Sequence, residues 1–250
     1  MEVKVFGVIG AGQMGNGIAQ VAAASGLNVI MNDIQQPFVD KGLKTIAGNL
    51  GRSVEKGKMT AADKEALLGR IKTSIALDDL AAADFVVEAA TEKQEIKFQL
   101  FRDLDRICRP DVILATNTSS IPGSWLASAT KRPDKCFNFN VSGPDTDKCE
   151  VMPNPLTAPE TMEAAMVFMR EIRCVPIRLP REIMGYVGNR IWRMVKKEAL
   201  KLIADGYATP DIIDRAWMAD WGTTMGPCMS MDQIGLDTIL SVEMIYFQAS

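Results

Sequence analysis

The feature that most constrains the fold is a glycine pattern close to the N-terminus. The pattern is G-x-G-x-x-G and consists of Gly10, Gly12 and Gly15. It follows an apolar, β-branched run at residues 3–9 and opens a helical stretch that reaches about residue 24. A second apolar strand at residues 28–31 leads to Asp33, which lies 23 positions after the first glycine. This order predicts a dinucleotide-binding βαβ unit, and a glycine-rich turn in another α/β fold is the alternative.

Each part of this unit has a physical role in holding a dinucleotide. The first glycine permits the tight turn, the second lets the backbone approach a pyrophosphate, and the third allows close helix–strand packing. Gln13 and Met14 begin the helix whose N-terminus faces the phosphates, so we expect both to contact the cofactor. Asp33 is expected to accept hydrogen bonds from the adenosine ribose and to repel a 2′-phosphate. No arginine occurs at residues 34–36, so NAD is predicted rather than NADP.

Strands and helices alternate over residues 1–180, which predicts an α/β fold: a Rossmann-type, doubly wound, mostly parallel sheet. The other strands are expected at 85–89, 112–116 and 136–139, and the helices at 37–57, 61–71, 96–107 and 126–130. After about Pro180 the pattern is helical only, at 185–204, 210–218 and 232–248. We therefore expect an NAD-binding domain over residues 1–182 and an all-helical domain over residues 183–250.

The composition excludes several classes of function. The formal net charge is −3 and no basic stripe is present, so a nucleic-acid partner is not expected. No apolar run is long enough for a membrane span and no export signal opens the chain, which favours a cytoplasmic protein without a membrane partner. The five cysteines form no C-x-x-C pair, and the chain contains no histidine. Reduced thiols and no metal site are therefore expected.

Six stretches in the same order along nearly the whole chain carry a resemblance to a known family. They read VIGAGQMGNGIAQ, VVEAATEKQEIKFQLF, ILATNTSSIP, ATKRPDK, GYVGNRI and MGP…DQIGLDT. The chain resembles the L-3-hydroxyacyl-CoA dehydrogenases, most closely the short bacterial 3-hydroxybutyryl-CoA branch. The resemblance implies fatty-acid metabolism, an acyl-CoA substrate, and a nucleotide domain followed by a helical domain that forms a homodimer.

The resemblance also assigns roles to residues at the matching positions. It implies that Glu92 and Lys97 lie along the cofactor. Asn117 and Ser119, in the NTSS stretch, are implied to meet the nicotinamide ribose and the 3-oxygen of the substrate. A plain turn is the alternative for this stretch, because asparagine and serine favour turns.

Three further positions are implied to contact the substrate. Asn189 would help to hold the reacting oxygen or the thioester, with a helix cap as its alternative role. Lys56 and Lys58 resemble the basic residues that bind the CoA phosphates, although a solvated helix end explains two lysines equally well.

The chain departs from the family pattern at the catalytic centre. The family has a histidine in an H-F-F-N-P segment, which accepts the proton, and a glutamate about twelve residues later, which orients it. Here Asn140 stands in the histidine position and Glu150 matches the glutamate, with two residues fewer between them. Because a carboxamide takes no proton near neutral pH, we expect ligand binding to persist and turnover to fall. Direct action by Asp145, Asp147 or Glu150, or through a water, stays open.

Three functions therefore remain. The first is the NAD-dependent interconversion of a short-chain L-3-hydroxyacyl-CoA and its 3-ketoacyl-CoA, impaired by the asparagine. The second is an inactive relative, natural or engineered, that binds NAD and acyl-CoA. The third is a dehydrogenase of a small hydroxy acid without CoA. The acyl length and the physiological direction do not follow from the sequence.

Assembly through the C-terminal helices is expected because large apolar residues are frequent there. These residues are Trp192, Met194, Trp217, Met218, Trp221, Met225, Met229 and Met231. Packing of the same residues against the nucleotide domain is the alternative. Family members continue with more helix after the IGLDT region, whereas this chain ends at Ser250, which leaves open whether the helical domain is complete.

Overall fold

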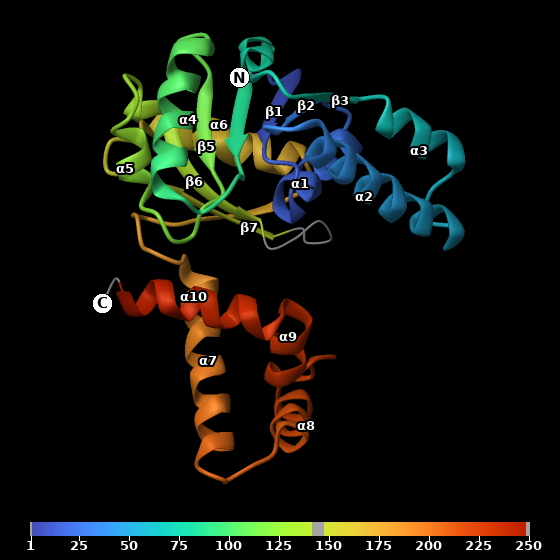
Figure 1. The fold of residues 1–250 in the computed structure, drawn as a ribbon, viewed down its shortest axis with the longest axis vertical. Helices are drawn as coiled ribbons and strands as arrows, with labels where there is room; N and C mark the ends of the chain where they lie inside the picture. Colours follow the sequence, from blue (N-terminus) through green and yellow to red (C-terminus); the bar gives the residue numbers. More distant parts are fainter. Residues whose placement is uncertain (1, 142–147, 249–250) are drawn as a thin grey trace. The chain divides into compact units, whose positions relative to one another are not determined.

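The structure is a computed structural model that describes residues 2–141 and 148–248. The chain divides into two compact units, residues 1–184 and 185–250, drawn in Figure 1. The first unit ends two residues beyond the predicted boundary. Ile183, the first residue past that boundary, donates its N–H to the Sδ atom of Met152 at 3.1 Å, which attaches it to the first unit.

The first unit contains an eight-stranded sheet with the order β3-β2-β1-β4-β5-β6-β7-β8. The strands are β1 (Val5–Ile9), β2 (Asn28–Asn32), β3 (Ile71–Ser74), β4 (Phe85–Glu88), β5 (Ile113–Thr116), β6 (Cys136–Val141), β7 (Lys148–Pro153) and β8 (Val175–Arg178). The β6–β7 pair is antiparallel and the other pairs are parallel. The strand order reverses between β1 and β4, which is where ligands bind in doubly wound sheets.

Helices cover both faces of this sheet, as predicted. One face packs against α1 (Gln13–Ala24), α2 (Gln36–Glu55), α3 (Ala61–Leu68) and α6 (Pro159–Glu171), and the other against the 3₁₀ helix η1 (Leu77–Ala82), α4 (Gln94–Ile107) and α5 (Gly123–Ala127). A short 3₁₀ turn, η2 (Pro133–Lys135), precedes β6. Successive residues of β4 enter the two cores in turn, as the two-residue period of a strand requires. Phe6, Phe85 and Phe168 fix the first core, with ring centroids 4.7–5.4 Å apart.

The sequence prediction was wrong at several elements of the first unit. The helix expected over residues 61–71 ends at Leu68, because the chain turns at Gly69 and Ile71 enters β3. Strands β3, β7 and β8 and helix α6 were not identified. In β8, Val175 and Ile177 are both exposed, so this edge strand has no buried face that a two-residue pattern could reveal.

The second unit contains helices α7 (Val187–Ala204), α8 (Pro210–Trp221), α9 (Pro227–Ile234) and α10 (Leu236–Gln248). The single helix predicted over residues 232–248 is wrong, because Gly235 adopts a φ of +95° and separates α9 from α10. A positive φ of this kind favours glycine and interrupts a right-handed helix. In the part of the chain that the structure describes, no helix combines the length and apolar character that a membrane span requires.

Candidate active site

The turn between β1 and α1 is packed on two sides and open on the third. Gly10 has a φ of +95°, and a Cβ atom there would lie 2.5 Å from the carbonyl oxygen of Ala89 after β4. A Cβ at Gly15 would lie 1.7 Å from the Gly10 carbonyl oxygen, whereas one at Gly12 would meet no atom within 4 Å. The absence of a side chain at Gly10 and Gly15 therefore allows the end of β1 to lie close to the end of β4 and to α1. Gly12 leaves room for a ligand against the backbone.

The N-terminus of α1 is suited to bind an anion. The helix has no side-chain cap at Gly12 and no acidic residue in its first turn. As in any helix, its first backbone N–H groups have no intrahelical acceptors, and they lie at the positive end of the helix dipole. A pyrophosphate is the group that such a site binds.

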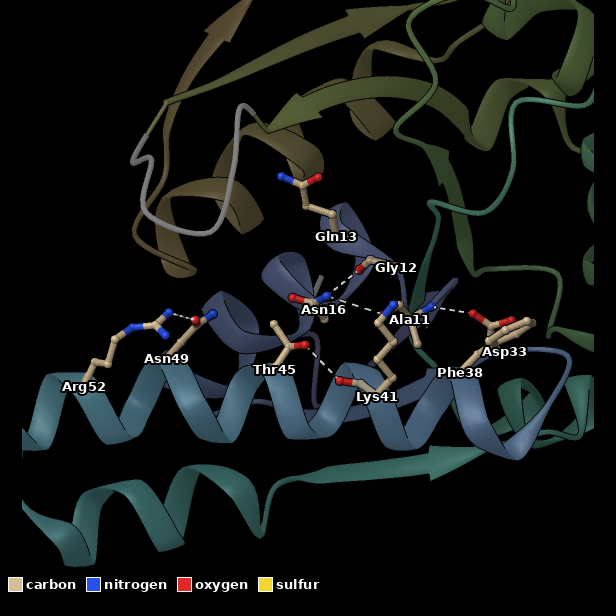
Figure 2. Close-up of a pocket in the computed structure, with 10 residues that line it drawn as sticks. All are labelled: Ala11, Gly12, Gln13, Asn16, Asp33, Phe38, Lys41, Thr45, Asn49 and Arg52. Carbon is tan, nitrogen blue, oxygen red and sulfur yellow. Dashed lines mark hydrogen bonds between the residues drawn. The ribbon is translucent and has the colours of Figure 1, made fainter. Parts of the chain in front are cut away.

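A cavity of about 570 Å³ adjoins this turn and follows helix α2. Figure 2 shows its lining, which comprises Ala11, Gly12, Gln13, Asn16, Asp33, Phe38, Lys41, Thr45, Asn49 and Arg52. Its volume lies in the range of small-molecule sites. Of the two residues predicted beside the glycines, Gln13 lines this cavity, and Met14 is half-buried and lies outside the lining.

The carboxylate of Asp33 is held against the glycine turn. Its Oδ2 atom accepts a hydrogen bond from the Ala11 N–H at 2.8 Å, and its Oδ1 atom accepts one from the Ile34 N–H at 2.7 Å. A carboxylate has about four acceptor positions, so both oxygens retain capacity for ribose hydroxyls. Lys41 and Arg52 line the same cavity. These cations lie beyond residues 34–36, on which the prediction of NAD over NADP depended.

A buried ion pair lies at the carboxyl ends of β4 and β5. Lys97 is 1% exposed and Glu88 is not exposed at all, and the Lys97 Nζ atom lies 2.7 Å from both carboxylate oxygens of Glu88. Glu88 also accepts hydrogen bonds from the Thr116 hydroxyl and the Ala90 N–H, each at 2.7 Å. The ammonium of Lys97 is thus committed to Glu88, and its predicted contact with the cofactor stays a prediction.

Glu92 connects this pair to the NTSS loop after β5. Its Oε2 atom accepts hydrogen bonds from the hydroxyls of Thr118, at 2.6 Å, and Ser120, at 3.2 Å, and lies 3.9 Å from Lys97 Nζ. Ser119 stands between these two hydroxyl residues and is half-buried. Glu92 therefore positions the loop in which Ser119 was predicted to meet the substrate.

Asn140 and Glu150 occupy directly opposed positions on the antiparallel strands β6 and β7. Both residues are half-buried, and opposed residues of an antiparallel pair place their side chains on the same face of the sheet. The next residue, Val141, donates its N–H to the Asn117 Oδ1 atom at 3.3 Å. The structure therefore brings the predicted dyad to the loop that carries Asn117 and Ser119.

The remaining predicted residues belong to α7, to the segment after α2 and to the β6–β7 connection. Asn189 is exposed on the first turn of α7, in the second unit. Lys56 follows the last turn of α2 and Lys58 lies two residues further, and both are exposed. Asp145 and Asp147, the alternative proton acceptors, lie outside the described residues.

Comparison with known proteins decides the family. Residues 5–183 match the 3-hydroxyacyl-CoA dehydrogenase NAD-binding domain, and residues 185–250 match the 3-hydroxyacyl-CoA dehydrogenase C-terminal domain. The chain belongs to the 3-hydroxyacyl-CoA dehydrogenase family. This membership confirms the resemblance, the α/β fold with a helical second domain, the NAD cofactor and the oxidoreductase class predicted from the sequence.

Several relatives in this family are similar over most of the chain. A probable 3-hydroxybutyryl-CoA dehydrogenase of Deinococcus radiodurans is 41% identical over 245 residues, which cover 97% of this chain and 87% of the relative. The 3-hydroxybutyryl-CoA dehydrogenase of Bradyrhizobium diazoefficiens is 37% identical over 242 residues, covering 96% and 82%. The crystal structure of (S)-3-hydroxybutyryl-CoA dehydrogenase from Ralstonia eutropha superimposes with a TM-score of 0.91 at 36% identity, covering 99% of this chain and 88% of that one.

The residues at the glycine turn fit the NAD cofactor of this family. The space over Gly12, the uncapped α1 N-terminus and the Asp33 carboxylate all lie at the carboxyl ends of β1 and β2.

Among the residues that the structure describes, no group of three histidine, cysteine, aspartate or glutamate side chains is arranged to hold a metal ion.

Two buried residues that support the candidate site were missed from the sequence. Asn138 is 1% exposed and donates a hydrogen bond from Nδ2 to the Thr118 carbonyl oxygen at 3.5 Å, beside Gly123, where a Cβ would lie 1.6 Å from Asn138 Oδ1. The sequence carried no signal for this contact, because it joins segments far apart in the chain. Glu88 did have a signal, since it is an acid that ends the apolar run FVVE.

Proposed function

We propose that this protein interconverts a short-chain L-3-hydroxyacyl-CoA and its 3-ketoacyl-CoA with NAD, and that its proton-transfer step is slowed. The observation that carries the proposal is the opposition of Asn140 and Glu150 beside the Asn117 loop. The substrate class follows the relatives, which are 3-hydroxybutyryl-CoA dehydrogenases. The slowed step follows from the carboxamide that stands where a base is required.

The chain's own residues account for binding and orientation. Gly12, the α1 N-terminus and Asp33 would hold NAD, which when bound would supply the acceptor for the hydride from C3 of the substrate. Ser119 would donate a hydrogen bond to the 3-oxygen from its hydroxyl. The Asn140 amide would donate a second one, with Glu150 opposite it to orient the carboxamide.

Removal of the proton from the 3-hydroxyl is the step that these residues do not complete. An amide donates and accepts hydrogen bonds but does not take a proton at neutral pH, and no histidine occurs anywhere in the chain. The proton would therefore pass to water, which a half-buried Asn140 does not exclude. A positioned base typically contributes on the order of 10²–10⁴-fold, and this is the factor that we expect to be missing.

The CoA part of the substrate is assigned to cationic and polar side chains. Lys56 and Lys58 would bind the phosphates at the end of α2, where both are exposed. Asn189, exposed on the first turn of α7, would hold the reacting oxygen or the thioester. These assignments rest on the family resemblance and on the exposure of the three side chains.

We further infer a homodimer formed through the helical unit. Large apolar side chains are exposed on its helices, among them Ile191, Met194, Trp221, Leu236 and Leu240, each more than half exposed. Exposed apolar surface of this extent favours association. A cytoplasmic location and a role in fatty-acid metabolism complete the proposal. The five cysteines are buried thiols that form no disulfide, which supports the location.

The substrate assignment is tested by NADH oxidation with acetoacetyl-CoA and, separately, with acetoacetate. We expect slow turnover of the CoA ester and none of the free acid. Turnover of acetoacetate at an equal rate would favour the small hydroxy-acid dehydrogenase. Binding of NADH and acetoacetyl-CoA without any turnover would favour an inactive relative.

A further inference from the structure

Helix α2 presents one face to the cavity that adjoins the glycine turn. Figure 2 shows the lining residues that this helix contributes, which are Phe38, Lys41, Thr45, Asn49 and Arg52. They follow one another at intervals of three or four residues, which places them on one side of a helix. One side of α2 thus forms a wall of the cofactor cavity, and two of its side chains, Lys41 and Arg52, are cations.

Gly42 fixes the point at which this wall meets the glycine turn. A Cβ atom at Gly42 would lie 2.7 Å from the carbonyl oxygen of Ala11 and 2.9 Å from its Cβ atom, so the backbone of α2 lies directly against the turn there. Lys41 precedes Gly42 and therefore lies beside the turn. Arg52 follows Gly42 by ten residues, which is roughly 15 Å further along the helix axis. Lys41 is thus the cation of this wall that adjoins the turn.

The lining side chains beside the turn differ in whether their hydrogen-bond donors are already used. Asn16 donates from Nδ2 to the Gly12 carbonyl oxygen at 2.6 Å. The Thr45 hydroxyl donates to the Lys41 carbonyl oxygen at 2.9 Å. Lys41 is exposed, and its ammonium forms no hydrogen bond or ion pair with the residues that the structure describes. All three of its donors are therefore available to a ligand in the cavity.

The charges around the turn favour a cation at this position. The pyrophosphate of a dinucleotide carries a negative charge on each phosphate, whereas the N-terminus of α1 supplies roughly half a positive charge. Asp33 adds a negative charge at the turn, since its Oδ2 atom accepts the Ala11 N–H bond. Without a cation, Asp33 would therefore disfavour the pyrophosphate as well as a 2′-phosphate.

We propose that Lys41 binds the pyrophosphate of NAD and sets the affinity of the site for this group. The usual fingerprint holds a pyrophosphate with backbone N–H groups and the helix dipole. A lysine adds a full charge on a flexible stem, which suits phosphate oxygens. The inference goes beyond the proposed function, because it rests on the NAD cofactor of the family and on the cavity beside Gly12. It does not depend on the substrate or on Asn140.

The first test is a fluorescence titration of the full chain with NADH at low ionic strength. We expect Lys41→Met to weaken NADH binding by roughly 5- to 20-fold, and Lys41→Arg to restore most of the affinity because it keeps the charge. Lys44→Met is the matched control, since Lys44 is an exposed lysine of the same helix outside the cavity lining. It should leave the dissociation constant unchanged. Equal losses in Lys41→Met and Lys44→Met would reduce Lys41 to a contribution to the general charge and overturn the proposal.

The second test identifies the group of the cofactor that Lys41 contacts. Calorimetric titrations with ADP and with adenosine compare ligands with and without the two phosphates. Lys41→Met should weaken ADP binding by the same factor as NADH binding and leave adenosine binding unchanged. The ratio of the NADH and NADPH dissociation constants should also stay as it is in the unaltered chain. A loss of NADPH affinity alone would assign Lys41 to the 2′-phosphate, and a loss of adenosine affinity would show a distorted cavity; either result contradicts the proposal.

The exposed position of Lys41 makes a change in folding unlikely to obscure these results, and thermal melting of each variant checks this. A folded Lys41→Met with unaltered NADH affinity would overturn the inference. If Lys41→Met melts at a lower temperature than the unaltered chain, Lys41→Gln removes the same charge with a polar side chain and decides in its place. Turnover of acetoacetyl-CoA tests the proposed function separately. Its absence would overturn that function and leave this inference intact, because the inference is measured by binding alone.

Discussion

Asn140 and Glu150 are register partners in the antiparallel pair of β6 and β7. Strand pairing, and not the length of the connection between the strands, therefore sets their proximity. The connection between Asn140 and Glu150 is two residues shorter than in the family pattern. Because the side chains of a strand alternate with a period of two residues, this difference leaves the two side chains on the same face of the sheet. In the mechanism that we propose, the dyad position is thus kept while its proton acceptor is replaced by a carboxamide.

Asp33 should control both the affinity and the choice of cofactor. We expect Asp33→Ala to weaken NADH binding and to reduce the discrimination against NADPH, because the acceptor for the ribose hydroxyls and the repulsion of a 2′-phosphate are both lost. Fluorescence titration of the two reduced cofactors measures this. Asp33→Asn is the control that keeps the side-chain shape, since its amide oxygen can still accept the Ala11 N–H bond. Tighter NADPH than NADH binding by the unaltered chain would contradict the prediction.

The buried pair of Glu88 and Lys97 should be a stability determinant. Lys97→Met leaves the Glu88 carboxylate buried without its cation, which we expect to cost about 3–5 kcal/mol in the free energy of unfolding. Urea unfolding followed by circular dichroism measures the change. Lys4→Met is the matched control, because Lys4 pairs with Glu2 at a site where both side chains are more than two-thirds exposed. Equal losses for the two variants would contradict the buried-pair account.

Asp84 should make the stability of the first unit depend on pH. It accepts hydrogen bonds from the N–H groups of Lys4 and Val5 and from Arg109. Burial raises the pKa of the Asp84 carboxyl, but these hydrogen bonds and the Arg109 charge outweigh it and lower that pKa overall. A lowered folded-state pKa adds stability above the unfolded value of about 3.9, and this stability is lost as the pH falls through the folded value.

The unfolding free energies of the unaltered chain and Asp84→Asn should accordingly differ most at neutral pH. Their difference should shrink as the pH is lowered below about 4. Asp111→Asn, at a neighbouring carboxylate that is 72% exposed, serves as the comparison and should show little pH-dependent difference. A gap between the unaltered chain and Asp84→Asn that grows on acidification would contradict the sign of this effect.

Local patterns in the sequence were sufficient for the nucleotide-binding half of the site and for most elements. The glycine turn and Asp33 lie within one βαβ unit, where spacing along the chain determines spacing in the structure. The contact of Asn138 with Thr118 was not predictable in this way, because it joins β6 to the loop after β5, which the sheet order makes neighbours. The contact of Glu88 with Lys97 spans nine residues between β4 and α4, and the acid that ends β4 was a signal that the sequence prediction did not use.

The missed elements have similar physical causes. Edge strand β8 buries neither Val175 nor Ile177, so no alternation marks it. The break at Gly235 depends on a positive φ, and an isolated glycine within an apolar helical pattern does not reveal its conformation. The cations Lys41 and Arg52 reach the cofactor cavity from a helix, beyond the residues that the usual fingerprint covers.

The proposed homodimer makes a direct prediction about mass. Light scattering at micromolar concentration should give about 55 kDa, twice the 27.3 kDa of the chain. Leu240→Glu, which places a charge on an exposed apolar side chain of α10, should shift the mass toward the monomer if α10 lies in the interface. A monomeric mass for the unaltered chain would reject the dimer.

The central claim is that Asn140 stands where the reaction requires a proton acceptor. The most direct test is the turnover number for NADH oxidation with acetoacetyl-CoA, measured for the unaltered chain, Asn140→Ala and Asn140→His. We predict slow turnover by the unaltered chain and an increase of at least about tenfold for Asn140→His, with Glu150 opposite to orient the imidazole. Rapid turnover by the unaltered chain that is unchanged in Asn140→Ala would contradict the claim, and would identify another group as the base.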